Sequence, residues 1–216
     1  MRDAATVLSE VMLFDAATPR EIEDLAGAAF TKRLGRGQIL FTSGEPADHL
    51  YVVLTGRLKI VINSDRGESL VIGFLSAGDT VGEMSVIDGL PRSAGVEALD
   101  ETAVLCLPTA AVRRLLEGSA AVALSVAEDL VARLRHVTDS AADRVFLDLP
   151  RRLAKLLAAT PDGLRLPQSE VAAQLGAARP TLNRALSSFQ RRGWVEVQRG
   201  GVVVLDVAAL ARFADS

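Results

Sequence analysis

The chain has 216 residues, of which 49% are hydrophobic and 24% charged, and its formal net charge is −3. This composition is ordinary for a globular protein, and no apolar run approaches the roughly 18 residues of a membrane-spanning helix. The first 15 residues carry Asp3 and Glu10 and lack a basic region followed by an apolar stretch, so we expect no secretory signal, no membrane contact and a cytoplasmic location.

Charge is distributed unevenly along the chain. Residues 150–216 hold ten Arg or Lys and five Asp or Glu, a balance of +5, whereas the rest of the chain carries −8. A basic segment on an acidic body favours phosphate contact by the C-terminal third alone.

The cysteine and histidine residues of the sequence give little support to a metal site, a redox role or catalysis. The single cysteine, Cys106, stands in an apolar, strand-like segment and cannot form an intrachain disulfide, so we expect it to pack in a core. His49 and His136 are far apart and have no cluster of ligand-type residues around them. We therefore predict no metal site, no cofactor, no catalytic residue and no enzymatic activity.

The first part of the chain is predicted to be a helix followed by a β-rich domain. Thr18-Pro-Arg-Glu21 has the pattern of a capping box with proline in the first helical turn. From residue 31 onward, short β-rich runs alternate with glycine turns every eight to twelve residues, which indicates an all-β barrel or roll. The clearest strands are Leu50–Leu54, Leu58–Ile62, Leu70–Phe74 and Ala103–Leu107.

Residues 109–148 lack proline and are predicted to form a long helix. Its apolar residues step by three and four, which is the a/d spacing of a two-helix seam. These seam residues are Ala127, Leu130, Leu134, Val137 and Ala141. A helix packed only on its own domain is the simpler interpretation, but the polar residues between the seam positions favour a parallel homodimer.

Residues 149–216 are predicted to form helix, helix, turn, helix and hairpin. A short helix over Gln168–Leu175 precedes Gly176, which suits the left-handed position after a helix end. Two β-rich runs flank a Gly200-Gly201 turn and predict a hairpin.

The segment 82–94, Gly82-Glu-Met-Ser-Val-Ile-Asp-Gly-Leu-Pro-Arg-Ser-Ala, suits a ligand with hydroxyls on one side and an anion on the other. Gly82 lets the backbone approach closely, and a helical turn after it can point N–H groups at an anion. Glu83 can accept from vicinal hydroxyls such as those of a ribose, and Arg92 can bind a phosphodiester with a bidentate fork. Chemistry alone leaves open that Glu83 and Arg92 simply pair with each other beside a turn.

The spacing over residues 170–186 is that of a helix-turn-helix. Arg179, Asn183 and Arg184 are expected on the outer face of its second helix, where Arg can read guanine and Asn adenine in the major groove. A solvated basic helix in a small helical domain is the alternative on chemistry alone. Backbone phosphate contacts are expected from Thr181, Ser188, Arg191, Arg192 and Arg199.

These motifs together resemble the CRP/FNR superfamily of bacterial transcription factors, the catabolite-activator and fumarate–nitrate-reduction regulators. Gly-Glu-Met-Ser followed by Asp-Gly-x-Pro-Arg-Ser-Ala is similar to the phosphate-binding cassette of that family, and the likeness covers nearly the whole chain. It implies an α+β protein in three parts. These are a cyclic-nucleotide-binding, jelly-roll-like β-roll with an N-terminal helix over 1–108, a dimerisation helix over 109–148 and a winged helix-turn-helix over 149–216.

The resemblance also implies a role for individual residues. The ligand contacts would be backbone groups of Gly82 and Met84, Glu83 at the ribose 2′-OH, Arg92 at the phosphate, Ser93 near the phosphate or purine, Arg133 near the nucleotide and Thr138 at the purine. The effector would be cAMP or a related cyclic nucleotide, and the partners would be double-stranded operator DNA, a second copy of the chain and RNA polymerase.

Two positions depart from the pattern of the family. Val137 stands where a threonine usually meets the purine, so one hydrogen bond to the base is missing. Pro180 stands where a glutamate often follows Arg179, so the operator is expected to differ at the position that this glutamate would read.

A regulator that is active without ligand, or that answers another ligand, is therefore an alternative. A regulatory module that acts through a protein partner is another. Members with haem or an oxygen-sensing cysteine cluster fit this sequence less well.

Overall fold

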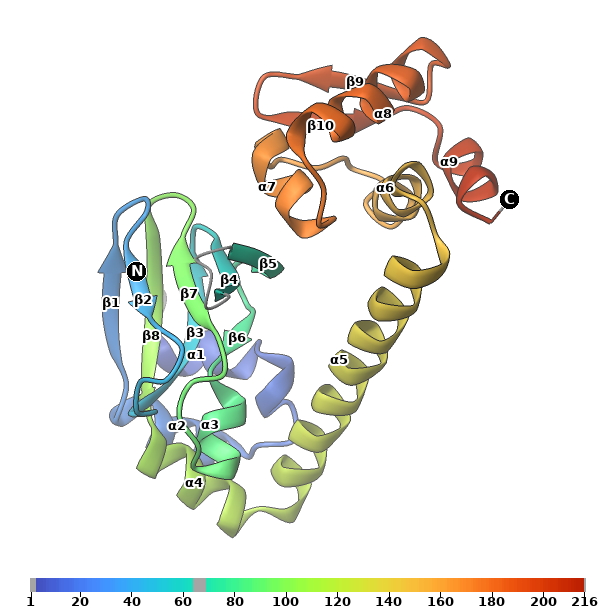
Figure 1. The fold of residues 1–216 in the computed structure, drawn as a ribbon. Helices are drawn as coiled ribbons and strands as arrows, with labels where there is room; N and C mark the ends of the chain where they lie inside the picture. The colour runs from blue at the N-terminus through green and yellow to red at the C-terminus, as the bar shows by residue number, and fades with distance from the viewer. Residues whose placement is uncertain (1–2, 64–68, 216) are drawn as a thin grey trace. The chain divides into compact units, whose positions relative to one another are not determined.

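The structure is a computed structural model that describes residues 3–63 and 69–215 (Figure 1). The chain divides into two compact units, Met1–Leu134 and Arg135–Ser216. The division falls within the long helix α5 (Ala120–Phe146), so α5 contributes residues to both units. The helix α5 ends at Phe146, two residues before the boundary expected after residue 148, and α6 begins at Leu149.

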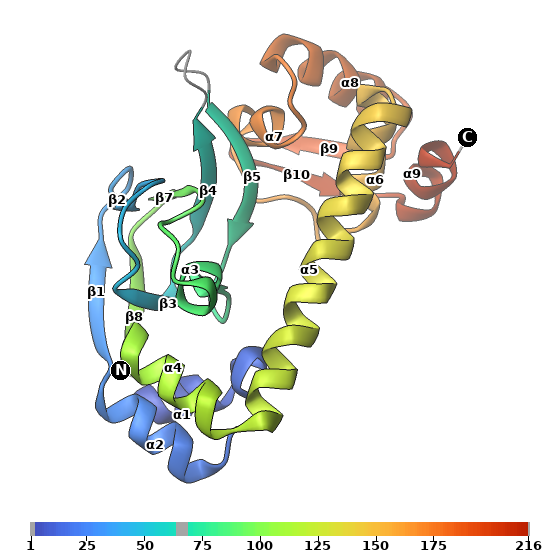
Figure 2. The ribbon, with the colours of Figure 1, turned by 60° about the horizontal axis from the view of Figure 1, so that its bottom comes forward.

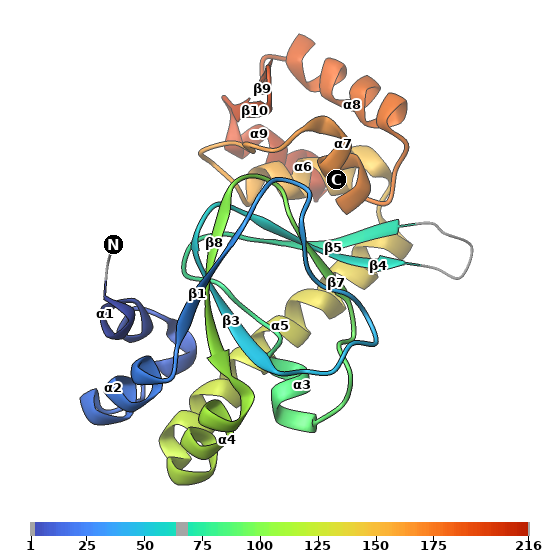
Figure 3. The same ribbon diagram turned by 90° about the vertical axis from the view of Figure 1, so that its left-hand side faces the viewer.

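Two four-stranded antiparallel sheets form a roll in the described part of the first unit (Figure 2, Figure 3). One has the order β1–β8–β3–β6, with β1 (Phe30–Leu34), β8 (Thr102–Pro108), β3 (His49–Thr55) and β6 (Thr80–Val81). The other has the order β2–β7–β4–β5, with β2 (Ile39–Phe41), β7 (Gly95–Ala98), β4 (Leu58–Asn63) and β5 (Ser69–Leu75). All four predicted strands are confirmed, as β3, β4, β5 and β8.

The two sheets share one apolar core, to which both contribute alternate inward residues. Cys106 of β8 lies in this core and is buried. Burial raises the pKa of the Cys106 thiol to about 11, so the thiol stays protonated at neutral pH. Its surroundings match the packing role that the sequence predicts.

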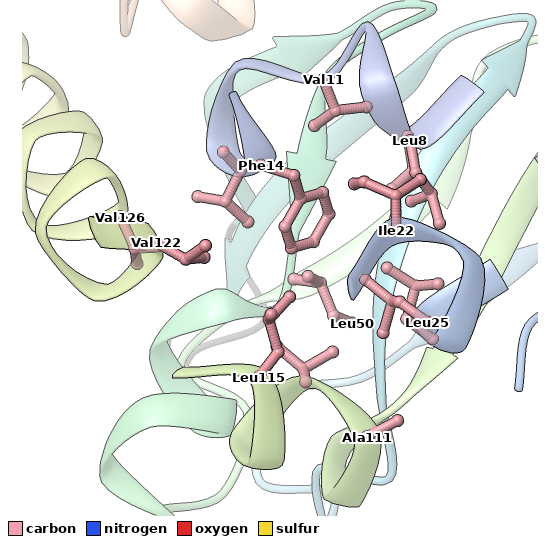
Figure 4. Packing of buried hydrophobic residues seen from close by; sticks show 14 of the residues in the cluster. Leu8, Val11, Phe14, Ile22, Leu25, Leu50, Ala111, Leu115, Val122 and Val126 are labelled. Atoms are coloured by element: carbon pink, nitrogen blue, oxygen red, sulfur yellow. The ribbon is translucent and has the colours of Figure 1, made fainter. Parts of the chain in front are cut away.

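A helical base adjoins the roll and has its own apolar cluster (Figure 4). Its elements are α1 (Ala4–Ser9), the 3-10 turn η1 (Met12–Phe14), α2 (Pro19–Gly27), α4 (Thr109–Gly118) and the first turns of α5. Figure 4 shows Phe14 within this cluster, with Val122 and Val126 of α5 on one side of it. The predicted capping box of α2 is confirmed, since Thr18 Oγ1 accepts from the Glu21 amide and Glu21 Oε2 accepts from the Thr18 amide at 2.7 Å.

The predicted helix over 109–148 is two helices, so the expectation of one continuous helix is wrong. Ser119 between α4 and α5 has extended backbone angles (φ −131°, ψ 99°). Gly118 and Ser119 are weak helix formers, so the break is inexpensive there. The turn that it makes lets the buried sides of α4 and α5 pack on the same cluster (Figure 1).

The second unit follows the predicted order of elements after the end of α5 and adds a C-terminal helix, α9 (Val207–Ala214), that was not predicted. The predicted elements are α6 (Leu149–Ala158), α7 (Gln168–Gln174), α8 (Arg179–Arg191), β9 (Val195–Gln198) and β10 (Gly201–Val204). Gly176 has a φ of 61°, as predicted for the residue after the end of α7. The helices α7 and α8 and the β9–β10 hairpin give this unit the elements of a winged helix-turn-helix.

The hairpin turn lies one residue earlier than predicted. Gln198 pairs with Gly201, so the turn residues are Arg199 and Gly200, and Gly200 has the positive φ of 88°. Gly201 is part of β10. A Cβ there would lie only 2.5 Å from the Leu164 carbonyl, so a close backbone approach and not the turn requires this glycine.

Candidate functional site

The predicted cassette, residues 82–94, forms the helix α3 (Glu83–Asp88) and the loop that leads to β7. Gly82 is the N-cap of α3 and has a φ of 95°, a left-handed conformation that favours glycine. A Cβ at residue 82 would collide with Arg92 Nη1. Gly82 therefore makes room for the guanidinium of Arg92, a task that the sequence pattern alone does not reveal.

The Arg92 side chain is buried, with 3% exposed, and points back under α3. Its Nη1 donates to the Gly82 carbonyl at 3.1 Å and its Nη2 to the His49 carbonyl. The guanidinium also lies over the Phe41 ring, 4.4 Å from the centroid, and near the Tyr51 ring. Its Nε is buried and has no hydrogen-bond partner among the described residues. Carbonyl oxygens and aromatic faces thus stabilise the positive charge of Arg92, and its Nε–H remains available for a hydrogen-bond acceptor.

Glu83 is also buried, with 8% exposed, and its partner is Arg133 of α5. Arg133 Nη1 lies 3.3 Å from Glu83 Oε1, and Arg133 Nη2 donates to Thr80 Oγ1 at 2.9 Å. Arg133 Nε forms an ion pair with Asp129 at 2.8 Å. The second oxygen of Glu83, Oε2, is buried without a hydrogen-bond partner in the described structure. The interpretation in which Glu83 and Arg92 pair with each other is therefore wrong.

A cavity of about 110 Å³ lies between α3 and the strands of the roll. Gly82, Glu83, Met84, Arg92 and Ser93 line it, so five predicted ligand residues meet at one place. Its other walls are apolar: Phe41, Ile60, Ile72, Val81, Ala94 and Val96, with Ser85 completing the lining. Ligand pockets usually measure roughly 300 Å³ or more. A nucleotide would thus require wall residues to move, and Met84 and Ile72 are exposed enough to do so.

The helix α5 has two distinct faces. Val122, Val126 and Leu130 pack on the helical base of the first unit, and Arg133 continues this stripe toward Glu83. Exposed residues form a second stripe that steps by three and four: Leu124, Ala127, Val131, Leu134, Thr138, Ala141 and Val145. At roughly 100° per residue, the two stripes lie well apart around the helix.

The exposed stripe shares Ala127, Leu134 and Ala141 with the predicted seam, which stays a prediction. Leu130 of that seam is partly buried against its own cluster, which the spacing of the sequence cannot reveal. Val137, 61% exposed, follows Arg133 by four residues and lies between the two stripes, whereas Thr138 is within the exposed stripe. Both belong to the second unit, so their contact with a nucleotide stays a prediction.

The recognition helix α8 buries one face and exposes the other. Leu182, Ala185, Leu186 and Phe189 are buried at helical spacing. Arg179, Pro180, Thr181 and Arg184 are exposed, and Ser188 is half-buried. Pro180 occupies the second helical position, where proline is tolerated.

Asn183 departs from the expected outer position. It is half-buried, and its Oδ1 is a buried oxygen without a hydrogen-bond partner in the described structure. At roughly 100° per residue, position 183 lies about 60° from the buried Leu186 and about 100° from Arg184. Ser187 instead is exposed three residues after Arg184. The spacing of the buried residues is sufficient to place Ser187, rather than Asn183, on the outer face of α8.

Basic residues continue along the wing and the end of α8. Arg199 is exposed at the hairpin turn, and Arg191 is exposed at the last turn of α8. Arg192 lies over the Trp194 ring, 4.8 Å from the centroid. Trp194 packs in turn against Phe189, so the wing joins the core behind α8.

The end of α5 is tied to the helix-turn-helix by charged groups. Lys155 of α6 pairs with Asp143 of α5 at 2.7 Å, and Arg144 of α5 donates to the Gln174 carbonyl at the end of α7. Arg152 of α6 donates to the carbonyls of Leu147 and Leu175. Within this unit, the last turn of α5 and the first helix of the DNA-binding motif are therefore held together.

Metal-type ligands do not gather in the described part of the chain. No group of three or more His, Cys, Asp and Glu residues is placed to hold an ion there. The His49 ring packs edge-on against Phe30, while the side chain of His136 lies outside the described residues. None of the described helices is long and apolar enough to cross a membrane.

Family models match both halves of the chain. A cyclic nucleotide-binding domain matches residues 31–119, and a Crp-like helix-turn-helix domain matches residues 144–213. The chain is 31% identical over 225 residues to the CRP-like cAMP-activated global transcriptional regulator of Mycobacterium tuberculosis, covering 96% of this chain and 98% of that protein. It is 30% identical over 208 residues to the cyclic AMP receptor protein of Thermus thermophilus, covering 94% and 96%.

Solved structures agree with these matches. A CRP-family transcriptional regulator from Thermus thermophilus superposes with a TM-score of 0.69 at 26% identity, over 86% of this chain and 97% of that one. The c-di-GMP-responsive regulator CLP of Xanthomonas campestris shares the fold, with a TM-score of 0.72 at 24% identity, over 87% and 99%. The chain belongs to the CRP/FNR family of transcriptional regulators. It is thus a DNA-binding regulator with a cyclic-nucleotide-binding domain, and not an enzyme.

Proposed function

We propose that the protein is a cytoplasmic, homodimeric regulator whose operator binding is controlled by cAMP in the β-roll. The observation that carries this proposal is a pair of buried polar atoms, Arg92 Nε and Glu83 Oε2. Both lack a hydrogen-bond partner among the described residues, and both residues line the same cavity. Leaving such groups unsatisfied is costly, and a cyclic nucleotide supplies what each lacks, a phosphate oxygen and a ribose hydroxyl. Relatives at 30–31% identity that are named for cAMP support this ligand.

The Glu83–Arg133 ion pair gives the ligand a route to the long helix. Glu83 forms an ion pair with Arg133 of α5. A ribose hydroxyl that donates to Glu83 withdraws part of the negative charge that this carboxylate offers to Arg133. The exposed stripe on α5 then packs against the same stripe of a second copy, and Thr138 on this stripe faces the ligand of the partner. Ligand binding and DNA binding are thereby coupled reciprocally.

The helix-turn-helix binds double-stranded operator DNA. Arg179 and Arg184 read base edges, and the two recognition helices of the dimer lie about one DNA turn, roughly 34–36 Å, apart. Asn183 holds a half-buried position and contributes less to base reading than its exposed neighbours. Backbone contacts come from Thr181, Ser188 and Arg199, and RNA polymerase is the expected protein partner at the promoter.

A different effector is the second candidate, and the size of the cavity favours it. A volume of about 110 Å³ and the apolar Val137 near the stripe of Arg133 both fit a purine less well than the usual family pattern. In this case the DNA-binding role is unchanged, but the regulator is active without ligand or answers a different ligand.

A DNA-selection experiment distinguishes the candidates. Full-length protein is incubated with random double-stranded DNA without ligand and with cAMP, cGMP or c-di-GMP, and the bound sequences are determined. A palindromic operator that is enriched only with cAMP supports the proposal. Enrichment without ligand, or only with another nucleotide, supports the second candidate. The absence of specific enrichment under all conditions contradicts both.

A further inference from the structure

Pro180 is exposed at the N-terminal end of α8, the part of a recognition helix that meets base edges. Arg184 follows it by four residues, so the two side chains lie about 40° apart on the helix surface. The buried residues Leu182 and Phe189 lie on the opposite side. Pro180 is therefore near the centre of the exposed face of α8.

The helix accepts this proline without losing a hydrogen bond. The amides of Thr181 and Leu182 donate to the Ala178 carbonyl at 2.9 and 3.1 Å, and these bonds begin after Pro180. An amide at position 180 would have no acceptor within the helix, because the first amides of any helix are free. Proline is thus compatible with the start of α8, and its exposed ring is an apolar surface on the outer face of the helix.

The chemistry of the proline side chain limits what it can recognise. It offers methylene groups and neither a donor nor an acceptor. In the major groove the thymine C5 methyl is the apolar group on a base edge, whereas cytosine offers an amino group that a carboxylate would accept. We propose that Pro180 makes a specificity-determining contact with a thymine methyl of the operator. This inference rests on the proposed function, since it requires α8 to enter the major groove.

Two neighbouring arginines narrow the base sequence that is expected in the operator half-site. Arg179 and Arg184 are exposed beside Pro180, and each favours a guanine with its O6 and N7 acceptors. Pro180 therefore places an apolar contact between two polar ones. The half-site is expected to contain a thymine, on either strand, next to a base pair read by arginine.

The test uses the operator selected with wild-type protein. Selection is repeated with Pro180→Glu, and the base pair whose preference changes toward cytosine marks the contacted position. A matched control, Ser187→Glu, adds the same charge to the same helix face two turns further on. It should weaken binding without altering the preference at this pair. Thermal unfolding confirms that both variants fold.

Binding is then measured to operators that differ by a single methyl group. Wild type should bind the thymine operator about fourfold more tightly than the deoxyuridine operator, because one such group contributes roughly 0.8 kcal/mol when it is buried. Adding a 5-methyl to cytosine at this pair should restore part of the affinity, and Pro180→Glu should lose both effects. Equal affinity for thymine and deoxyuridine, or no thymine at the marked pair, overturns the inference while the DNA-binding function stands. If wild type selects no operator, the proposed function and this inference fail together.

Discussion

Arg133 of α5 and Glu83 of α3 form an ion pair, with 3.3 Å between Nη1 and Oε1. Glu83 lines the cavity of the cassette. Arg133 belongs to α5, and the other face of this helix carries the exposed stripe. The same guanidinium also donates to Thr80 of β6, two residues before the cassette. One side chain thus connects the wall of the cavity to the helix that is expected to join two protomers.

The Glu83–Arg133 pair should be measurable as a coupling energy. In a double-mutant cycle with Glu83→Gln and Arg133→Met, we expect about 0.5–1 kcal/mol in the free energy of unfolding, measured by urea denaturation. The value is modest because the Arg133 side chain is 38% exposed and solvent screens the pair. Strictly additive effects of the two substitutions would contradict the ion pair.

Substitutions at two glycines with the same backbone conformation should separate the cost of backbone strain from the effect on the geometry of the site. Gly78 and Gly82 both have a φ of 95°, but a Cβ at Gly78 meets nothing within 4 Å, whereas a Cβ at Gly82 meets Arg92. Gly78→Ala should cost only backbone strain, about 1–2 kcal/mol, and leave nucleotide affinity unchanged. Gly82→Ala should cost more and also abolish binding, since it displaces the guanidinium. Calorimetric titration and thermal unfolding of both variants test this, and equal effects would contradict the assigned role of Gly82.

The exposed stripe predicts which face of α5 meets a second copy. Leu134 lies on this stripe and is 64% exposed in the single chain, so Leu134→Arg should leave the fold intact and weaken the dimer about 100-fold or more by burying an unpaired charge. Asp139→Arg adds the same side chain about 140° around the helix from Leu134 and should leave the dimer unaffected. Sedimentation analysis over a range of concentrations distinguishes them. A dimer that survives Leu134→Arg would show that another face is used.

Base and phosphate contacts predict different effects of salt. Arg184→Ala should cost roughly 1–3 kcal/mol of operator affinity and relax the preference at one base pair. Arg199→Ala, at the wing, should weaken all sequences alike and reduce the salt slope by about 0.9 for each phosphate contact that is lost. Fluorescence anisotropy at several salt concentrations measures both. A sequence-independent loss for Arg184→Ala would place it on the phosphate backbone instead.

Local rules account for the elements that the sequence predicts correctly. The capping box at Thr18 and the left-handed Gly176 depend on a few neighbouring residues, and both are confirmed. The alternation of apolar residues and glycine turns likewise predicted β3, β4, β5 and β8. The resemblance to the phosphate-binding cassette placed five of its residues at one site, and all five line the same cavity.

Long-range packing explains the features that the sequence could not predict. The partners of Arg92 include the His49 carbonyl, 43 residues away, and no local pattern reveals it. The partial burial of Leu130 on α5 depends on its packing against the helical base, which is distant in sequence. Asn183 satisfies the spacing of an outer residue but is half-buried.

The most direct test of the account is the calorimetric titration of cAMP into the full chain, with Arg92→Ala and the exposed Arg36→Ala as a matched pair. We predict saturable binding of one cAMP per protomer for wild type and for Arg36→Ala. Arg92→Ala should weaken binding by at least about 30-fold, since removing one partner of a buried charged contact costs roughly 2–5 kcal/mol. Unchanged cAMP binding by Arg92→Ala, or no binding by the wild-type protein, would contradict the claim that Arg92 forms the anion site of a cAMP sensor.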